Sequence, residues 1–266
     1  MYQPIPPRSP LETMPTMYDL PSELVGESGL PDEFHCMQAD LLSETCQPVD
    51  YPLEEILLAS NLNLYYDPRH TQWYKRPDWY MVLGVPRATQ QQELRLSYLM
   101  WQEGVAPFLA VELLSPGTES EDLGRRLREI NQPPTKWEVY ERILRIPYYI
   151  VYDRYENNLR AFGLVNASYK AIALPENRLW LDAIGIGLGL WQGVYQQTSG
   201  LWLRWYDQSG WLPTLAEKIE AESQRVEAER QRTEFERQRA ESERQRADKL
   251  AAYLRSQGID PDNLPD

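Results

Sequence analysis

The chain has 266 residues, of which 42% are hydrophobic and 11% aromatic, a composition typical of a globular protein with one sizeable core. It contains no apolar run of about eighteen residues and no signal-peptide pattern, so the sequence predicts a cytoplasmic protein without a membrane span. The formal net charge of −13 argues against a large non-specific surface for a polyanion such as DNA.

Residues 1–50 are rich in Pro, Glu, Asp and Ser and predict an irregular N-terminal arm. This arm holds both cysteines, Cys36 and Cys46, whose spacing matches no zinc site and no disulfide framework, so we expect two free thiols. We interpret the only histidines, His35 and His70, as surface or loop residues. With two histidines, His-based triads and His-rich metal sites are disfavoured.

Residues 51–212 predict a folded domain in which strands flank a helix. A short helix or strand is expected at 54–63, and helices at 121–130 and 136–144 follow a Pro-Gly loop at 116–117. The strands are expected at 78–85, 108–114 and 148–152, with a hairpin or loop partner at 94–101, a hairpin of 159–165 with 169–174, and a last hairpin of 202–205 with 211–212.

Residues 179–191 carry three glycines at alternate positions, a pattern that superficially resembles a phosphate loop. Neither the GxGxxG register nor a GK[ST] ending is present. We therefore predict one bent strand here.

From residue 213 the composition changes to Glu, Arg, Gln and Ala, and Glu-Arg-Gln-Arg recurs at 229, 236 and 243. This repeat predicts one long charged helix over 213–257, followed by a flexible tail at 258–266. The semi-apolar line at seven-residue spacing is weak, so a solvated single helix and a weak coiled coil both stay open. In the second case Leu250, Tyr253 and Leu254 are the expected contact patch.

Two carboxylates interrupt apolar strands and are the strongest sign of chemistry. Asp78 opens the apolar run 78–85, and Glu112 lies inside the run 108–114. A charged side chain within an apolar strand costs several kcal/mol unless a partner compensates it, and a divalent cation is such a partner. The pattern therefore predicts that Asp78 and Glu112 bind Mg²⁺ or Mn²⁺.

The motifs occur in a characteristic order: Pro77-Asp78, Glu112-Leu-Leu-Ser-Pro116, Asp122, Lys136 with Tyr140, and the strand at 148–153. This order resembles the Uma family, within the PD-(D/E)xK nuclease superfamily. The resemblance implies a restriction endonuclease-like α/β (α+β) fold, with a mixed central sheet flanked by helices. It also implies that Asp78 and Glu112 bind the cation beside a scissile phosphate of a nucleic acid.

The sequence departs from the superfamily at the E-x-K lysine, because Leu114 stands two residues after Glu112. The resemblance implies that Lys136 takes this role from the following helix, in a Lys-x-x-x-Tyr pattern. Asp122 is a weaker candidate, since a helix start also favours an acid. Glu33 is the only candidate for an additional N-terminal acid.

Three hypotheses follow. The first is a metal-dependent endonuclease acting on DNA through Asp78, Glu112 and Lys136, with a basic cluster at 125–128 facing the substrate and a homodimer as an expectation. The second is an inactive scaffold or binding protein of the same fold that acts through its C-terminal helix. The third is a nucleotide-handling enzyme of another class.

Overall fold

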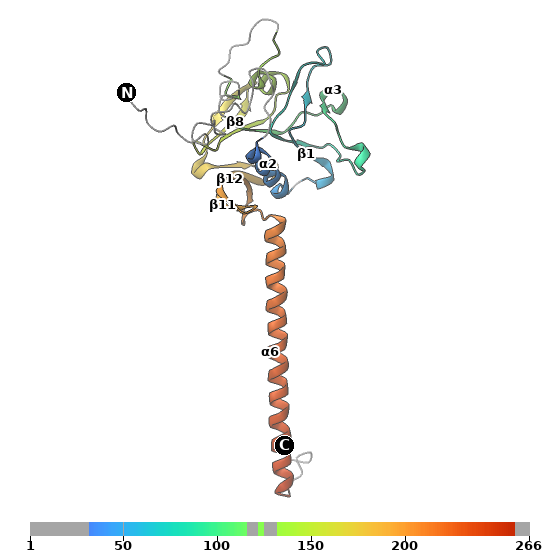
Figure 1. Ribbon diagram of the computed structural model, residues 1–266, viewed down its shortest axis with the longest axis vertical. Coiled ribbons are helices and arrows are strands. Elements are labelled where there is room, and N and C mark those ends of the chain that lie inside the picture. Colours follow the sequence, from blue (N-terminus) through green and yellow to red (C-terminus); the bar gives the residue numbers. More distant parts are fainter. Residues whose placement is uncertain (1–31, 50, 116–121, 125–131, 259–266) are drawn as a thin grey trace, which may run out of the picture. The chain divides into compact units, whose positions relative to one another are not determined.

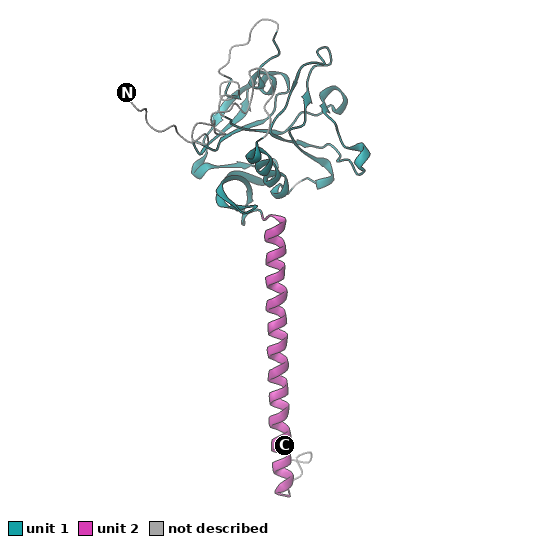
Figure 2. Ribbon diagram, viewed as in Figure 1, with its two compact units in different colours: residues 1–212 teal, residues 213–266 magenta. Residues whose placement is uncertain are grey.

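The computed structural model describes residues 32–49, 51–115, 122–124 and 132–258. The chain divides into two compact units, residues 1–212 and 213–266 (Figure 2). In the described residues, the first unit contains three β-sheets and short helices, and the second contains one long helix. None of the described helices combines the length and the apolar character needed to cross a bilayer.

A six-stranded mixed sheet is the main element of the first unit, in the order β1-β4-β6-β7-β8-β9. Figure 1 labels two of its strands, β1 and β8. Strands β6 and β7 run parallel, and the other neighbours are antiparallel. The predicted mixed α+β fold is confirmed, together with the strands expected around Asp78 and Glu112. The bounds are β1 (Ile56–Ser60), β4 (Trp79–Leu83), β6 (Leu109–Leu113), β7 (Tyr148–Asp153), β8 (Asn158–Val165) and β9 (Ser168–Ile172).

The central strands are buried on both faces, which explains why they read as continuous apolar runs. Along β4, Trp79 and Met81 pack into one core cluster, and Tyr80 packs into a second cluster on the opposite face. Strand β6 alternates in the same way, which turns Glu112 toward the Tyr80 side. Tyr140 belongs to that same cluster.

The helix predicted at 136–144 begins as expected but changes its winding. The helix α5 (Lys136–Glu138) continues as a π-helical turn, η3 (Val139–Ile143). Glu141 in this turn is 6% exposed, and its carboxylate accepts the backbone N–H of Tyr169 at 2.8 Å. A buried acidic residue of the π-helical turn thus bonds to the backbone of β9.

A four-stranded antiparallel sheet follows in the chain, in the order β10-β11-β12-β13. The prediction of one bent strand at 179–191 is wrong, because the chain reverses in a turn at 182–185 that ends at Gly185, which has φ +66°. The predicted last hairpin is confirmed as part of this sheet. The bounds are β10 (Arg178–Leu181), β11 (Ile186–Tyr195), β12 (Thr198–Asp207) and β13 (Gly210–Trp211).

Short elements complete the first unit. A three-stranded sheet has the order β3-β2-β5. The hairpin or loop partner expected at 94–101 contains only the two-residue strand β5, with short helical turns on both sides. These elements are β2 (Leu64–Tyr65), β3 (Tyr74–Lys75), β5 (Tyr98–Leu99), η1 (Leu53–Glu55), η2 (Gln91–Glu93), α3 (Met100–Glu103) and η4 (Pro175–Asn177).

The N-terminal segment corrects the expectation of an irregular arm, because it contains the helix α2 (Glu33–Thr45). Gln38 ties this helix to β12: its Nε2 donates to the Leu203 carbonyl at 2.7 Å, and its Oε1 accepts the Leu203 N–H at 2.9 Å. The buried face of α2 includes the polar residues His35, Gln38 and Thr45. The apolar periodicity that would have predicted the helix is weak for that reason.

Both cysteines are free thiols, as predicted. Cys36 is exposed, and Cys46 is buried, which raises the pKa of its thiol. His70 lies exposed in a loop, as expected. The same expectation for His35 is wrong, because His35 lies in α2 and is only 5% exposed.

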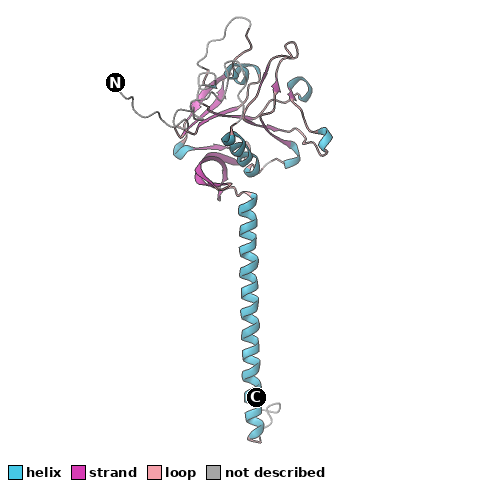
Figure 3. Ribbon diagram, viewed as in Figure 1, coloured by secondary structure: helices cyan, strands magenta, loops and turns pink. Residues whose placement is uncertain are grey.

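The second unit consists of the helix α6 (Leu215–Ser256), drawn as the long helix in Figure 3. A capping box of Thr214 and Glu217 begins it, and none of its residues is buried. Glu and Arg three or four residues apart form exposed ion pairs along it, such as Arg239 Nε to Glu243 Oε1 at 3.0 Å. The predicted long helix is confirmed, and its pairing with a second copy stays a prediction.

Several predicted features lie outside the described residues. These are the Pro-Gly loop at 116–117, most of the helix at 121–130 with its arginines Arg125, Arg126 and Arg128, the first thirty-one residues of the arm, and all but the first residue of the tail at 258–266.

Candidate active site

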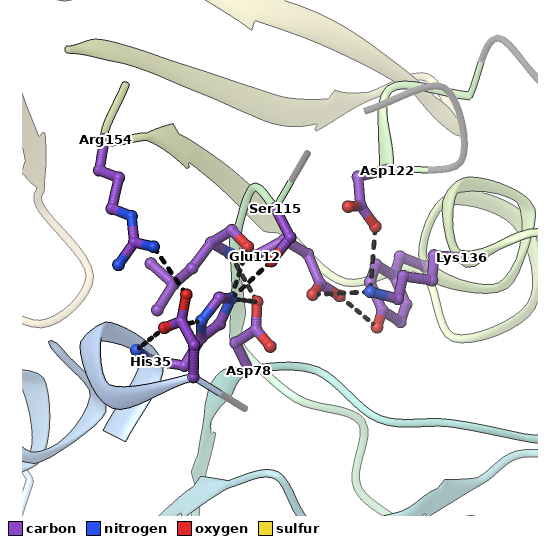
Figure 4. Close-up of polar contacts among 10 residues, drawn as sticks. His35, Asp78, Glu112, Ser115, Asp122, Lys136 and Arg154 are labelled. Atoms are coloured by element: carbon purple, nitrogen blue, oxygen red, sulfur yellow. Dashed lines mark hydrogen bonds and ion pairs between the residues drawn. The ribbon is translucent and has the colours of Figure 1, made fainter. Parts of the chain in front are cut away.

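Asp78 and Glu112, the two carboxylates predicted to form a site, lie opposite each other in the central sheet (Figure 4). Asp78 directly precedes β4, and Glu112 lies inside β6. The antiparallel register pairs Trp79 with Val111. One step further along both strands brings residue 78 opposite residue 112, so the sheet itself makes the carboxylates neighbours.

Glu112 is fully buried, and groups from one helical segment contact both of its carboxylate oxygens. Lys136 Nζ lies 3.0 Å from Oε2, and the Tyr140 hydroxyl donates to Oε1 at 2.8 Å. Burial raises the pKa of Glu112 well above its ordinary value, and the ammonium of Lys136 opposes that rise. The charge of this carboxylate therefore depends on the positive charge that its neighbours supply.

The four-residue spacing of Lys136 and Tyr140 puts both side chains on one face of the helical segment. Thr135 fixes where the segment begins, because its hydroxyl accepts the N–H of Glu138, whose carboxylate accepts the Thr135 N–H at 3.0 Å. The Lys136 side chain is only 21% exposed. The structure thus brings both members of the Lys-x-x-x-Tyr pattern to Glu112.

A third carboxylate, Asp122, approaches Lys136 from a described segment that ends at Gly124. Asp122 is 2% exposed, and its Oδ1 lies 3.0 Å from Lys136 Nζ. The Tyr149 hydroxyl holds this segment by donating to the Asp122 carbonyl at 2.9 Å. Gly124 has φ +67°, and a Cβ there would lie 2.7 Å from Trp137 Cγ. Asp122 is thus an ion-pair partner of Lys136, beyond the helix-start role that its sequence context also allowed.

Lys136 is surrounded by negative charge. Burial lowers the pKa of Lys136, but the carboxylates of Asp122, Glu112 and Asp78 raise it more, and the pKa lies well above its ordinary value. The amine is therefore protonated at neutral pH. It can stabilise negative charge, but it has no lone pair with which to accept a proton.

Asp78 is tied to the strand that carries Glu112. Its Oδ2 accepts the backbone N–H of Leu113 at 2.6 Å, and its side chain is 17% exposed. Within the part of the chain that the structure describes, no group donates a hydrogen bond to Oδ1 of Asp78. Burial raises the pKa of Asp78, while the charges of Lys136 and His35 lower it. One oxygen of Asp78 thus keeps lone pairs for a further ligand.

Three carboxylates surround the ammonium of Lys136, and the His35 ring lies near one of them, Asp78. Carboxylate oxygens are the ligands that Mg²⁺ and Mn²⁺ prefer. Among the described residues, no three His, Cys, Asp or Glu side chains are arranged to hold a metal ion by themselves. The carboxylates of Asp78 and Glu112 have the donor chemistry that such a hard cation would need.

His35 also joins this cluster, which the sequence did not predict. Its Nδ1 lies 2.6 Å from Asp32 Oδ1, and its Nε2 lies 2.9 Å from the carbonyl oxygen of Leu113. The same Nε2 lies 3.9 Å from Asp78 Oδ2 and 3.5 Å from Ser115 Oγ. The helix α2 therefore delivers an imidazole to the strand end that follows Glu112 (Figure 4).

The surroundings of His35 define its charge. Both ring nitrogens face acceptors, a carboxylate and a carbonyl, and this arrangement favours the doubly protonated imidazolium form. Burial lowers the pKa of His35, but the hydrogen bond to Asp32 and the charge of Asp78 raise it above its ordinary value. Burial alone raises the pKa of Asp32, yet its bonds to His35 and the charge of Arg154, whose Nη2 is 2.7 Å away, hold it well below its ordinary range.

Part of this arrangement has a signal in the sequence. Asp32 is the N-cap of α2 and accepts the backbone N–H of His35, three residues on, at 2.9 Å. An Asp three residues before a His therefore indicates a tight turn or a helix start, in which the carboxylate meets the histidine. The contact to Leu113 has no such signal, because the two residues are 78 positions apart. Glu33, the N-terminal acid considered from the sequence, is exposed on α2, and no contact among the described residues joins it to the cluster.

Comparison with known proteins gives one family. The profile of Uma2, described as "Putative restriction endonuclease", matches residues 11–192, more than half of the chain. The matched range includes all the residues of the cluster described above. No curated protein matches the chain.

Proposed function

Because this chain belongs to the Uma2 family, we propose that it is a metal-dependent endonuclease that hydrolyses phosphodiester bonds of DNA. The observation that supports this most is the environment of Glu112. A fully buried carboxylate beside a second carboxylate, with an ammonium at 3.0 Å, is a costly arrangement for a protein that only needs a stable core. The same arrangement suits phosphoryl chemistry.

In this proposal Asp78 and Glu112 hold one Mg²⁺ or Mn²⁺ ion. When bound, such an ion polarises a phosphate oxygen and favours ionisation of an attacking water. Asp78 contributes the oxygen that accepts no hydrogen bond from the described residues. Tyr140 and Lys136 hold the Glu112 carboxylate in one orientation, so that its remaining lone pairs face a fixed direction.

We assign Lys136 the role of stabilising charge on the phosphate. The carboxylates around it raise its pKa and keep it protonated, which favours this role over that of a base. Leu114 occupies the position of the usual lysine and is buried in the core. The lysine therefore comes from α5 instead of β6, and its ammonium still reaches Glu112.

The test is cleavage of supercoiled plasmid by the purified protein in Mg²⁺ or Mn²⁺. We expect nicking that EDTA abolishes, and losses of about 100-fold or more in Asp78→Asn, Glu112→Gln and Lys136→Met. Glu141→Gln is the matched control, because Glu141 is also a buried glutamate of the first unit but binds the Tyr169 N–H instead of the cluster. Retained activity in Glu112→Gln contradicts the proposal.

The charge distribution favours a second candidate, a scaffold of nuclease fold. Helix α6 has ten acidic and ten basic residues, so the net charge of −13 lies entirely outside it, where it disfavours binding of a polyanion. If wild-type protein neither cleaves DNA or RNA nor binds Mn²⁺ by calorimetry, the scaffold is the better assignment. Sedimentation of the full chain beside a chain that ends at residue 212 would then test whether α6 forms a dimer.

A further inference from the structure

We propose that His35 is a positioning residue of the proposed active site, and that Asp32 holds its ring in place. This inference rests on the nuclease function proposed above. His35 acts through the peptide groups next to Glu112 and not on the substrate, because its ring is buried and both of its nitrogens are already bonded within the protein.

The residue that connects His35 to the carboxylates is Leu113. Its N–H donates to Asp78 Oδ2 at 2.6 Å, and its carbonyl accepts from His35 Nε2 at 2.9 Å. Leu113 directly follows Glu112. Its N–H and its carbonyl therefore connect the carboxylate of Asp78 and the imidazole of His35 to the strand that carries Glu112. Fixing the Leu113 carbonyl therefore restricts rotation of the strand end and the direction in which Asp78 points.

Residues of α2 other than His35 also attach the helix to the first unit. Gln38 makes two hydrogen bonds to the backbone of Leu203, and Trp205 Nε1 donates to the Leu42 carbonyl at 3.0 Å. The helix is therefore anchored to β12 by other residues. We therefore assign the bond from His35 to the Leu113 carbonyl to positioning of the strand end beside Glu112, and not only to attachment of the helix.

The chain contains an internal comparison for this arrangement. Asp67 and His70 repeat the Asp-x-x-His spacing, and His70 Nδ1 lies 2.8 Å from Asp67 Oδ2. The His70 side chain is 47% exposed, and its ring stacks on Trp73 at a centroid distance of 4.0 Å. The Asp–His bond alone is thus a local turn feature, and what sets His35 apart is its contact with Leu113.

The experiment compares His35→Ala, His35→Gln and Asp32→Asn with His70→Ala as the control. The readouts are kcat and KM for plasmid cleavage, the affinity for Mn²⁺ by titration calorimetry, and the melting temperature. In His35→Ala we expect kcat and Mn²⁺ affinity to fall by about 10- to 100-fold with little change in KM, when measured well below the melting temperature. His35→Gln keeps an N–H for Leu113 and should recover part of the loss, while His70→Ala should match wild type.

The outcomes separate this inference from the function on which it rests. If wild type cleaves DNA and His35→Ala retains its kcat and Mn²⁺ affinity, the positioning role is overturned and the nuclease stands. If losses in His35→Ala and His35→Gln follow only their melting temperatures, His35 is structural and the inference is again overturned. If wild type neither cleaves nor binds Mn²⁺, the proposed function fails, and the positioning role fails with it.

Discussion

Two ion pairs of the same length lie in very different surroundings. Lys136 Nζ and Glu112 Oε2 are 3.0 Å apart with side chains 21% and 0% exposed, whereas Arg239 Nε and Glu243 Oε1 are 3.0 Å apart with side chains 70% and 66% exposed. Distance therefore does not distinguish them. What differs is the water that each group lost on folding.

This difference separates the two units of the chain. Helix α6 carries twenty charged residues, all exposed, and each exposed pair is worth a few tenths of a kcal/mol. The site in the first unit gathers Asp78, Glu112, Asp122 and Lys136 with little access to water. Where water is excluded, each unpaired charge costs more free energy than it would on the surface. Under the same condition, charges also act more strongly on a substrate.

The largest expected effect is that of Lys136→Met. It leaves Glu112 and Asp122 buried without their cation and should lower the free energy of unfolding by roughly 3–5 kcal/mol, measured by urea denaturation without metal. Adding Glu112→Gln should restore part of that loss, because it removes one of the unpaired charges. A stability equal to wild type in Lys136→Met would show that the buried pair is no more important than an exposed one.

A smaller effect is expected for Tyr140→Phe. The change removes the hydroxyl that donates to Glu112 Oε1 at 2.8 Å. Loss of this donor to a buried carboxylate should lower the free energy of unfolding by about 1–3 kcal/mol in the same denaturation assay. Tyr80→Phe is the matched control, since the buried Tyr80 hydroxyl has no hydrogen-bond partner among the described residues. Equal losses in both variants would contradict the importance assigned to the Glu112 contacts.

The sequence predicted which residues of the cluster come together, although it missed parts of the fold around them. Asp78 and Glu112 stand out because a charge in an apolar strand needs a compensating partner, and the resemblance to the Uma family pointed to Lys136 and Tyr140 at helical spacing. These signals are local. The structure brings all four together, and their role in metal binding and cleavage stays a prediction.

The features that the sequence did not predict depend on distant partners. The buried face of α2 is partly polar because Gln38 bonds to Leu203 and His35 to Leu113, so apolar periodicity could not reveal it. In the π-helical turn at 139–143, Glu141 accepts a hydrogen bond from the backbone N–H of Tyr169 in β9, a partner that the local sequence does not reveal. The break of 179–191 at Gly185 was missed because alternation continues on both sides of the turn.

A third prediction concerns an exposed charge with strong local bonds. Asp207 Oδ1 accepts the Ser209 hydroxyl and N–H at 2.6 and 2.7 Å, and these bonds lower the pKa of Asp207. A lowered folded pKa means that its stabilisation is present above the unfolded pKa, near 3.9, and is lost as pH falls through the folded value. The free energies of unfolding of Asp207→Asn and wild type should therefore differ at pH 7, by less than the effect of Tyr140→Phe, and the difference should disappear as the pH falls through the folded pKa of Asp207.

The smallest effect is expected on α6. Arg239→Gln removes the exposed pair with Glu243, whereas Arg230→Gln changes an arginine of the same helix that forms no ion pair with the described residues. Thermal unfolding of the helix is followed by circular dichroism in both variants. The difference in helix stability between them gives the contribution of the ion pair, which we expect to be about 0.3–0.5 kcal/mol. In 1 M salt, where the Debye length is about 3 Å, the difference should vanish. A larger or salt-resistant difference would mean that Arg239 is shielded from water in solution, as it would be in a coiled coil with a second copy.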